Sequence, residues 1–167
     1  LEEAVKQALK ICHARKPDPD FKSFPEKTAH KPISKICDKV ISQLSPEEPI
    51  DLVHDQIKIA SGDKRVKAVR CLTSLSVSNT AILNSLGVSG RYDASSFYTY
   101  VYVLAEENGS SGVGWEDYTN RFFTPDEPIK IARDAKNLAI QQLHAKPIER
   151  GKADLVISPD ALSKLLI

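Results

Sequence analysis

The chain has 167 residues, of which 41% are apolar and 27% are charged, and its formal net charge is +1. This length and apolar content fit one domain or slightly more, built around a single buried core. Acidic and basic residues are nearly equal in number and spread along the chain, which argues against a large field of one sign that would attract nucleic acid or anionic lipid. No apolar run approaches the roughly 20 residues that a membrane-spanning helix needs, so we expect no membrane partner.

The N-terminal third predicts two amphipathic helices separated by an extended connection. Apolar residues recur at helical spacing up to Ala14. From Lys16 to Pro32, four prolines among polar residues exclude a helix or a central strand. Residues 33–44 then show the clearest helical periodicity of the chain, and we expect them to form the second helix. Its apolar positions are Ile33, Ile36, Cys37, Val40, Ile41 and Leu44.

A third helix is expected directly afterwards. Ser45-Pro46-Glu47-Glu48 has the pattern of a capping box with proline at the first helical position. Val53, Ile57 and Ala60 follow at helical spacing, and Gly62 is expected to end the helix in a left-handed conformation.

The middle of the chain predicts an antiparallel meander of three strands. Apolar and polar residues alternate over 66–77, and a turn-rich stretch over 84–90 precedes a second strand over 95–106. In that strand we expect one face to carry Phe97, Thr99, Val101, Val103 and Ala105. A hairpin loop at 108–112 leads into a third strand over 113–123.

The C-terminal part predicts a helix, a short buried strand and the start of another helix. Thr124-Pro125-Asp126-Glu127 reads as a second capping box before an apolar helical face. Leu155-Val156-Ile157 is the expected strand, and Ser158 is the expected N-cap of the last helix. Helices followed by strands and then a helix predict an α+β fold, an antiparallel β-meander packed with amphipathic helices.

We expect the chain to be an internal piece of a larger multidomain protein, because it starts inside a helical pattern and stops in the first turn of a new helix. Residues 1–151 are the expected central α+β domain, with a helical lead-in over 1–62, the antiparallel sheet over 63–123 and a helix over 124–145. Residues 152–167 are the expected start of a truncated following domain.

Neither the cysteines nor the histidines have the spacing of a metal site. Cys12, Cys37 and Cys71 are far apart and lack close pairing, so we interpret them as small buried residues of a protein in a reducing compartment. No two of the four histidines share a helical turn, and surface or structural roles are favoured for all. The histidines are His13, His30, His54 and His144. We therefore assign no catalytic, cofactor-binding or metal-binding residue in this chain.

Two further patterns have alternative interpretations. The glycine-rich run over 109–114 precedes a strand pattern, whereas a phosphate-binding loop precedes a helix, so a hairpin is favoured. The stripe of Tyr98, Tyr100 and Tyr102 favours packing against another domain or subunit. Two alternatives remain. The stripe could contact an extended peptide, or it could contact nucleic acid with the help of Arg70, Arg91 and Arg121.

Several segments resemble the TldD/PmbA family, whose members have been described as modulators of DNA gyrase and as metallopeptidases. The likeness is carried by SVSN at 76–79 with NSLGV at 84–88, by FYTYVYVLAEE at 97–107, by the helix from Asp126, and most specifically by AKPIERGKADLVISPDALSKLL at 145–166. LEEAVKQALKI and PDPDFKSFP near the start resemble the approach to the central domain of these proteins.

This resemblance implies the central scaffold domain of a cytoplasmic protein more than twice as long. Active members hold zinc with an H-E-x-x-x-H helix and a later cysteine, with the glutamate as base. That motif is missing here, so we expect no activity and no zinc in this chain alone, and zinc only in a full-length protein. The ending SPDALSKLL is closer to the PmbA-like half, which typically lacks the zinc motif.

The functional expectation is therefore a part in proteolysis or peptide maturation, within a metallopeptidase or its inactive partner subunit. Expected partners are a second copy or a TldD-like subunit, together with a peptide or unfolded-protein substrate. The alternative is a non-enzymatic binding module that modulates DNA gyrase or contacts nucleic acid.

Overall fold

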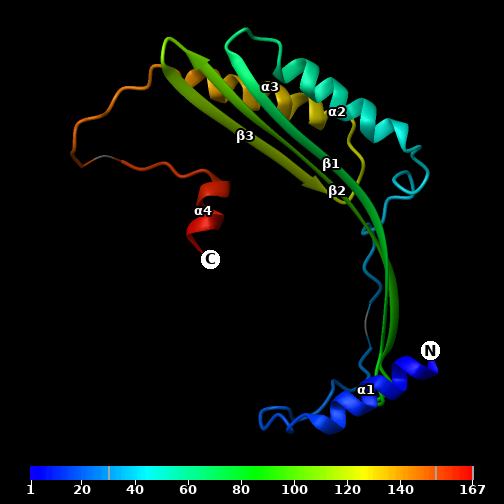
Figure 1. Cartoon of the computed structure of the whole chain (residues 1–167). Coiled ribbons are helices and arrows are strands. Elements are labelled where there is room, and N and C mark those ends of the chain that lie inside the picture. The colour runs from blue at the N-terminus through cyan, green and yellow to red at the C-terminus, as the bar shows by residue number, and fades with distance from the viewer. Residues whose placement is uncertain (30, 153, 167) are drawn as a thin grey trace. The chain divides into compact units, whose positions relative to one another are not determined.

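A computed structural model describes residues 1–29, 31–152 and 154–166, and its three strands form one sheet in the order β1-β2-β3 (Figure 1). In chain order the elements are α1 Glu2–Ala14, α2 Glu47–Ala60, β1 Val66–Leu83, β2 Ser89–Glu107, β3 Ser110–Asn120, α3 Glu127–Gln141 and α4 Pro159–Leu165. An antiparallel meander with flanking helices confirms the α+β prediction. No helix in the described residues is both long and apolar enough to cross a membrane.

The residues group into two compact units, and each is described by itself. The hairpin unit consists of Leu1–Pro49, Ser74–Tyr98 and Thr119–Thr124. The core unit consists of Ile50–Thr73, Thr99–Tyr118 and the described residues of Pro125–Ile167. Both β1 and β2 contribute residues to each unit.

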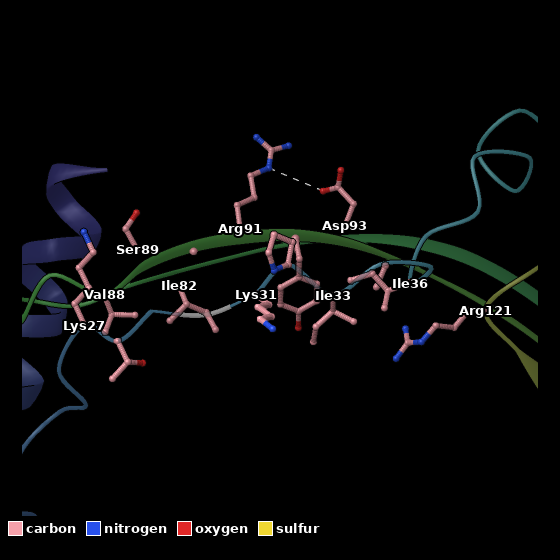
Figure 2. A pocket seen from close by; sticks show the side chains of 15 residues that line it. Lys27, Lys31, Ile33, Ile36, Ile82, Val88, Ser89, Arg91, Asp93 and Arg121 are labelled. Carbon is pink, nitrogen blue, oxygen red and sulfur yellow. Dashed lines mark ion pairs between the residues drawn. The ribbon is translucent and has the colours of Figure 1, made fainter.

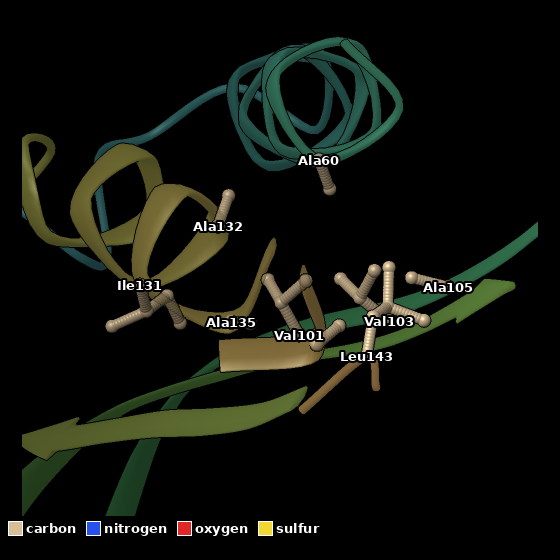
Figure 3. Packing of buried hydrophobic residues seen from close by; sticks show 9 residues of the cluster. Ala60, Val101, Val103, Ala105, Ile131, Ala132, Ala135 and Leu143 are labelled. Atoms are coloured by element: carbon tan, nitrogen blue, oxygen red, sulfur yellow. The ribbon is translucent and has the colours of Figure 1, made fainter. Parts of the chain in front are cut away.

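The core unit holds the main hydrophobic core, in which α2 and α3 cover one face of the sheet (Figures 1 and 3). Val101, Val103 and Ala105 are fully buried on β2, as the alternation of the strand predicts. They pack against Ala60 of α2 and against the apolar face of α3. The α3 residues in the cluster are Ile131, Ala132, Ala135 and Ala139, and Leu143 follows the helix.

Glycines on β3 let the backbone of α3 approach the sheet closely. A methyl group placed at Gly114 would overlap the carbonyl oxygen of Ala135, and one at Gly112 would overlap that of Ala139. The run over 109–114 is therefore a hairpin and a helix-packing surface. Its turn is only two residues long, because Asn108 (φ 49°) and Gly109 (φ 79°) suffice to reverse the chain, so β3 starts earlier than predicted.

A buried polar network also belongs to the core unit and ties α2 to the strands. Gln56 Nε2 donates to Thr99 Oγ1 over 2.9 Å and to the Pro128 carbonyl over 3.4 Å. Thr73 Oγ1 lies 3.2 Å from Gln56 Oε1 and 3.0 Å from Thr99 Oγ1. Gln56 and Thr99 are both fully buried, so these bonds replace the water that the two side chains lose on folding.

The predicted helix over 33–44 is wrong. The described backbone is neither helix nor strand up to Asp38 and forms only a turn over 39–43, with Lys35 at φ 60°. Ser95 N donates to the Ile36 carbonyl over 3.0 Å, and Asp38 N donates to Ser95 Oγ over 2.7 Å. Asp38 Oδ2 in turn accepts from Phe123 N over 2.9 Å. Bonds to β2 and to the residues after β3 therefore replace those that a helix would make within itself.

Helix ends were predicted with mixed success. One of the two bonds of the first capping box is present: Ser45 N donates to Glu48 Oε2 over 2.7 Å. Ser158 Oγ caps α4, as predicted, by accepting from Ala161 N over 3.3 Å. The Thr124 capping box is wrong: Asp126 is the N-cap of α3 and makes no side-chain bond to the helix. Thr124 Oγ1 is instead buried with no hydrogen-bond partner among the described residues.

Three further predictions differ from the structure. Gly62 follows α2, but the described glycines with positive φ are Gly87 and Gly109, so the left-handed helix end at Gly62 is wrong. The segment 155–157 is not a strand, and Val156 is 96% exposed. Leu155 is likewise 79% exposed, whereas a buried strand would have these side chains covered. Finally, β1 and β2 extend further than predicted, because their hairpin continues to the turn at 84–88.

Candidate binding groove

A groove of about 840 Å³ lies within the hairpin unit (Figure 2). Residues of 27–28 and 31–36 form part of its lining, the ends of β1 and β2 beside their connecting turn form another part, and Arg121 completes it. Segments far apart in the sequence thus share one surface. The segment that sequence periodicity assigned to a helix supplies Ile33 and Ile36 to this surface.

Two sets of hydrogen bonds hold the segment and the hairpin in place. At the turn, Asn84 Nδ2 donates to the Pro25 carbonyl over 2.8 Å, and Asn84 Oδ1 accepts from Leu86 N and Val88 N, each over 3.0 Å. Further along β2, Ser95 binds the backbone of Ile36 and also donates to the Arg121 carbonyl over 2.6 Å. Both ends of the groove are therefore anchored by bonds to the backbone.

The groove has an apolar lining that is open to solvent. Ile33 is 76% exposed, Ile82 is 56% exposed and Tyr92 is 48% exposed. Pairing of Asn84 with Val88 sets the register of the hairpin, so that Ile82 and Tyr92 belong to the same face of the ribbon. A contiguous exposed apolar surface of this kind is typical of an interaction site.

Positive charge surrounds this apolar lining. In the described part of the chain, no carboxylate lies within ion-pair distance of Lys27, Lys31 or Arg121. Arg91 is 3.9 Å from Asp93, which also accepts from Asn79 Nδ2 over 2.7 Å. Figure 2 shows Arg91 and Asp93 pointing to the other side of the ribbon from Lys31 and Ile33. The side of the groove that carries the isoleucines is thus cationic.

The histidines are scattered through the structure. His13 on α1 and His54 on α2 are exposed, and His30 lies outside the described residues. His144 follows α3, where its backbone N donates to Ser110 Oγ over 2.8 Å and its Nε2 lies 3.1 Å from Glu107 Oε2. Among the described residues, no three His, Cys, Asp or Glu side chains are gathered as metal ligands.

The cysteines differ from the prediction that all are buried. Cys12 is exposed on α1, because no described segment covers the apolar stripe of that helix. Cys37 and Cys71 are half-buried. Burial raises the pKa of the Cys71 thiol to about 11, which makes this thiol a poor nucleophile at neutral pH.

The shortest ion pair in the described part of the chain lies just before β1 and is structural. Arg65 Nη2 is 2.7 Å from Asp63 Oδ2, and Arg65 Nε is 2.9 Å from Asp63 Oδ1, which makes the contact bidentate. The hydrogen bonds from the Arg65 side chain and backbone hold the pKa of Asp63 well below its usual value. The same pairing raises the pKa of Arg65.

The tyrosines lie on the strand face opposite the buried valines, as predicted. In the core unit Tyr100 stacks on Trp115, with ring centroids 4.7 Å apart and planes at 14°. Trp115 is 44% exposed. Arg70 belongs to the core unit, whereas Arg91 and Arg121 belong to the hairpin unit, so the structure does not bring the three arginines together in one unit.

The sequence pattern does not predict this groove. The i, i+3 spacing of Ile33 and Ile36 is typical of one helical face, whereas in an extended strand it would put the two side chains on opposite faces, so the pattern predicts a helix. The available signals were Pro25 and Pro32, which both precede Ile33, and the turn pattern at Asn84 and Gly87. None of them identifies β2 as the partner of the segment.

A family model described as the PmbA/TldA metallopeptidase central domain matches residues 39–143. Among solved structures, the chain is similar to a proposed modulator of a DNA gyrase from Thermotoga maritima, with a TM-score of 0.75 and 22% identity. It is also similar to TldE from Thermococcus kodakarensis, with a TM-score of 0.69 and 21% identity. A proposed modulator of DNA gyrase from Bacteroides thetaiotaomicron has a TM-score of 0.75 and 18% identity.

These matches cover most of this chain and a minor part of each relative. The Thermotoga protein is matched over 90% of this chain and 34% of its own length, the Thermococcus protein over 81% and 30%, and the Bacteroides protein over 99% and 39%. The chain therefore spans about a third of the length of the solved proteins that it matches. No curated protein sequence matches it.

Proposed function

Because this chain belongs to the TldD/PmbA family, whose central-domain model matches well over half of it, we propose that it is a non-catalytic scaffold domain of a protein that takes part in proteolysis or peptide maturation. The parent is either a metallopeptidase or the inactive partner of one. The family match over 39–143 carries this proposal, and the likeness in fold to TldE supports it.

Zinc is the metal that this family implies, and the described residues of this chain do not fit it. A zinc site needs three or four gathered nitrogen, sulfur or carboxylate ligands, and the described residues contain no such group. We therefore assign no step of peptide hydrolysis to a residue of this chain. In this proposal a cytoplasmic parent, as a homodimer or with a TldD-like subunit, supplies the metal from another region.

The contribution of this chain would be to bind and position polypeptide. The groove offers an apolar lining with cations beside it, and its anchored ends keep that surface in place. Binding energy from a surface remote from the reacting bond helps to orient a substrate.

The test is to measure metal content and peptide hydrolysis of the full-length parent before and after chelation. One zinc per chain with chelator-sensitive hydrolysis of unstructured peptides supports the active alternative. Hydrolysis that appears only when a TldD-like subunit is added supports the partner alternative. If neither preparation hydrolyses peptides, the proposal is wrong.

A binding module that contacts nucleic acid or modulates gyrase is the second candidate. The stacked pair of half-buried Tyr100 and exposed Trp115 favours it, because aromatic rings hold single strands by stacking with their bases. The formal net charge of +1 provides little attraction for phosphate. Salt-sensitive DNA binding that is lost in Tyr100→Ala would support this candidate, whereas no binding at low salt would exclude it.

A further inference from the structure

We propose that the groove of the hairpin unit selects extended polypeptide segments in which acidic residues alternate with apolar ones. This inference rests on the proposed function and adds a binding site and a preference for one class of substrate. The site consists of Lys27, Lys31 and Arg121 together with Ile33, Ile82 and Tyr92.

The dimensions of the groove indicate an extended chain as its ligand. The lining runs from Val88, directly before β2, to Ala94 on that strand, and a strand rises about 3.3 Å per residue, so this wall is ~20 Å long. That length accommodates about six residues of an extended peptide. In Figure 2, Lys27 lies toward one end beside Val88, and Arg121 lies at the other end beyond Ile36.

The arrangement of charge indicates acidic groups on that ligand. Lys27, Lys31 and Arg121 have no carboxylate partner among the described residues, and the acidic residue of the lining, Asp93, is already bound to Asn79 and paired with Arg91. A carboxylate placed beside any of the three free cations gains a charge-assisted hydrogen bond. Complementary charge of this kind sets the specificity of binding more than its strength.

The apolar side chains favour a polypeptide over nucleic acid. Exposed isoleucines at positions 33 and 82 separate the cations, and Tyr92 is the one aromatic residue among the described residues of the lining, so successive bases would find no row of rings on which to stack. A nucleic acid strand also carries a phosphate on every nucleotide, which calls for a denser row of cations than three in ~20 Å. A peptide whose leucine or valine residues alternate with aspartate or glutamate matches both features.

The test is fluorescence anisotropy of the 167-residue chain with labelled seven-residue peptides at low salt. The first peptide alternates glutamate with leucine, the second replaces each glutamate by glutamine, and the third replaces each by lysine. We expect the acidic peptide to bind most tightly and to lose affinity as salt is added. Equal affinity for the acidic and glutamine peptides would overturn the proposal, as would tighter binding of single-stranded oligo(dT).

Variants locate the site on the chain. Lys31→Glu and Arg121→Glu should each weaken binding of the acidic peptide by about fivefold, because each reverses the charge at an exposed contact. Ile33→Ser should weaken binding of the acidic and glutamine peptides alike.

The matched control is Lys64→Glu, an equal charge change on an exposed residue of the core unit, which should leave both affinities unchanged. A loss in Lys64→Glu equal to that in Lys31→Glu would overturn the assignment, and circular dichroism verifies that each variant is folded.

These results can be distinguished from those that test the proposed function. If the chain prefers the acidic peptide but the full-length parent, alone or with a TldD-like subunit, hydrolyses nothing, the groove stands and the proteolytic role fails. If the parent hydrolyses peptides but the chain binds acidic and glutamine peptides equally, the proteolytic role stands and the groove assignment fails.

Discussion

Adding one methyl group to β3 should separate α3 from the sheet. In Gly114→Ala, the new Cβ would overlap the Ala135 carbonyl oxygen and would lie 2.7 Å from the Ala135 carbonyl carbon and 2.9 Å from Ala139 N. All three atoms belong to the helix backbone, so no side chain can rotate to make room. The helix itself must move away from β3, against the packing of Ala132, Ala135 and Ala139 in the core.

The expected loss of stability is about 2 kcal/mol. Overpacking that forces a backbone shift costs about 1–3 kcal/mol. Replacing glycine with alanine stiffens the unfolded chain and recovers about 0.4–1 kcal/mol. We take a cost near the top of the first range, because helix backbone must move, and subtract the second. The net loss is about 2 kcal/mol, which lowers the folding equilibrium constant roughly 30-fold.

Urea unfolding followed by far-ultraviolet circular dichroism measures this loss. The matched control is Gly151→Ala, where a Cβ would meet nothing within 4 Å, and it should change stability by less than about 0.5 kcal/mol. Adding Ala135→Gly to Gly114→Ala should give no rescue, since the overlap is with backbone atoms, and it should cost about 1 kcal/mol more. Stability of Gly114→Ala equal to that of Gly151→Ala, or rescue by Ala135→Gly, would refute the close approach of α3.

Three other predictions follow from the described contacts. Gln56→Leu should lower the free energy of unfolding by about 1–3 kcal/mol in urea titrations, because it removes the bonds that Gln56 makes to Thr99, Thr73 and the Pro128 carbonyl, whereas the exposed Gln7→Leu should have little effect. Pairing with Arg65 lowers the pKa of Asp63 in the folded state, so its contribution to stability is present above the unfolded pKa of about 3.9 and is lost as the pH falls below it. Asp63→Asn should therefore flatten the decline of the urea midpoint below about pH 4, and an unchanged decline would contradict this pairing. At neutral pH a thiol reagent should modify exposed Cys12 well before half-buried Cys71. Mass spectrometry of the digested peptides measures the order, and earlier modification of Cys71 would contradict this prediction.

The buried face of β2 and the apolar face of α3 were predicted from the sequence because their patterns are local and long. Alternation over 97–105 marks one buried strand face, and all five predicted residues of that face are fully buried. The apolar repeat in α3 likewise identified Ile131, Ala132, Ala135 and Ala139. Extended strands and regular helices repeat with fixed periods, so a long pattern leaves little choice of element.

The groove could not be predicted in this way, since its walls are made by contacts distant in sequence. Residues 33–44 carry a helical pattern, yet bonds from Ser95 and Phe123 hold Ile36 and Asp38 in an irregular segment. The glycines at 112 and 114 were visible as a hairpin pattern, but their role in admitting α3 depends on which helix lies against β3. The sequence by itself determined the elements whose periodicity is strong and the α+β class. Only the tertiary structure decided where a weakly committed segment lies, because its backbone hydrogen bonds go to partners far along the chain.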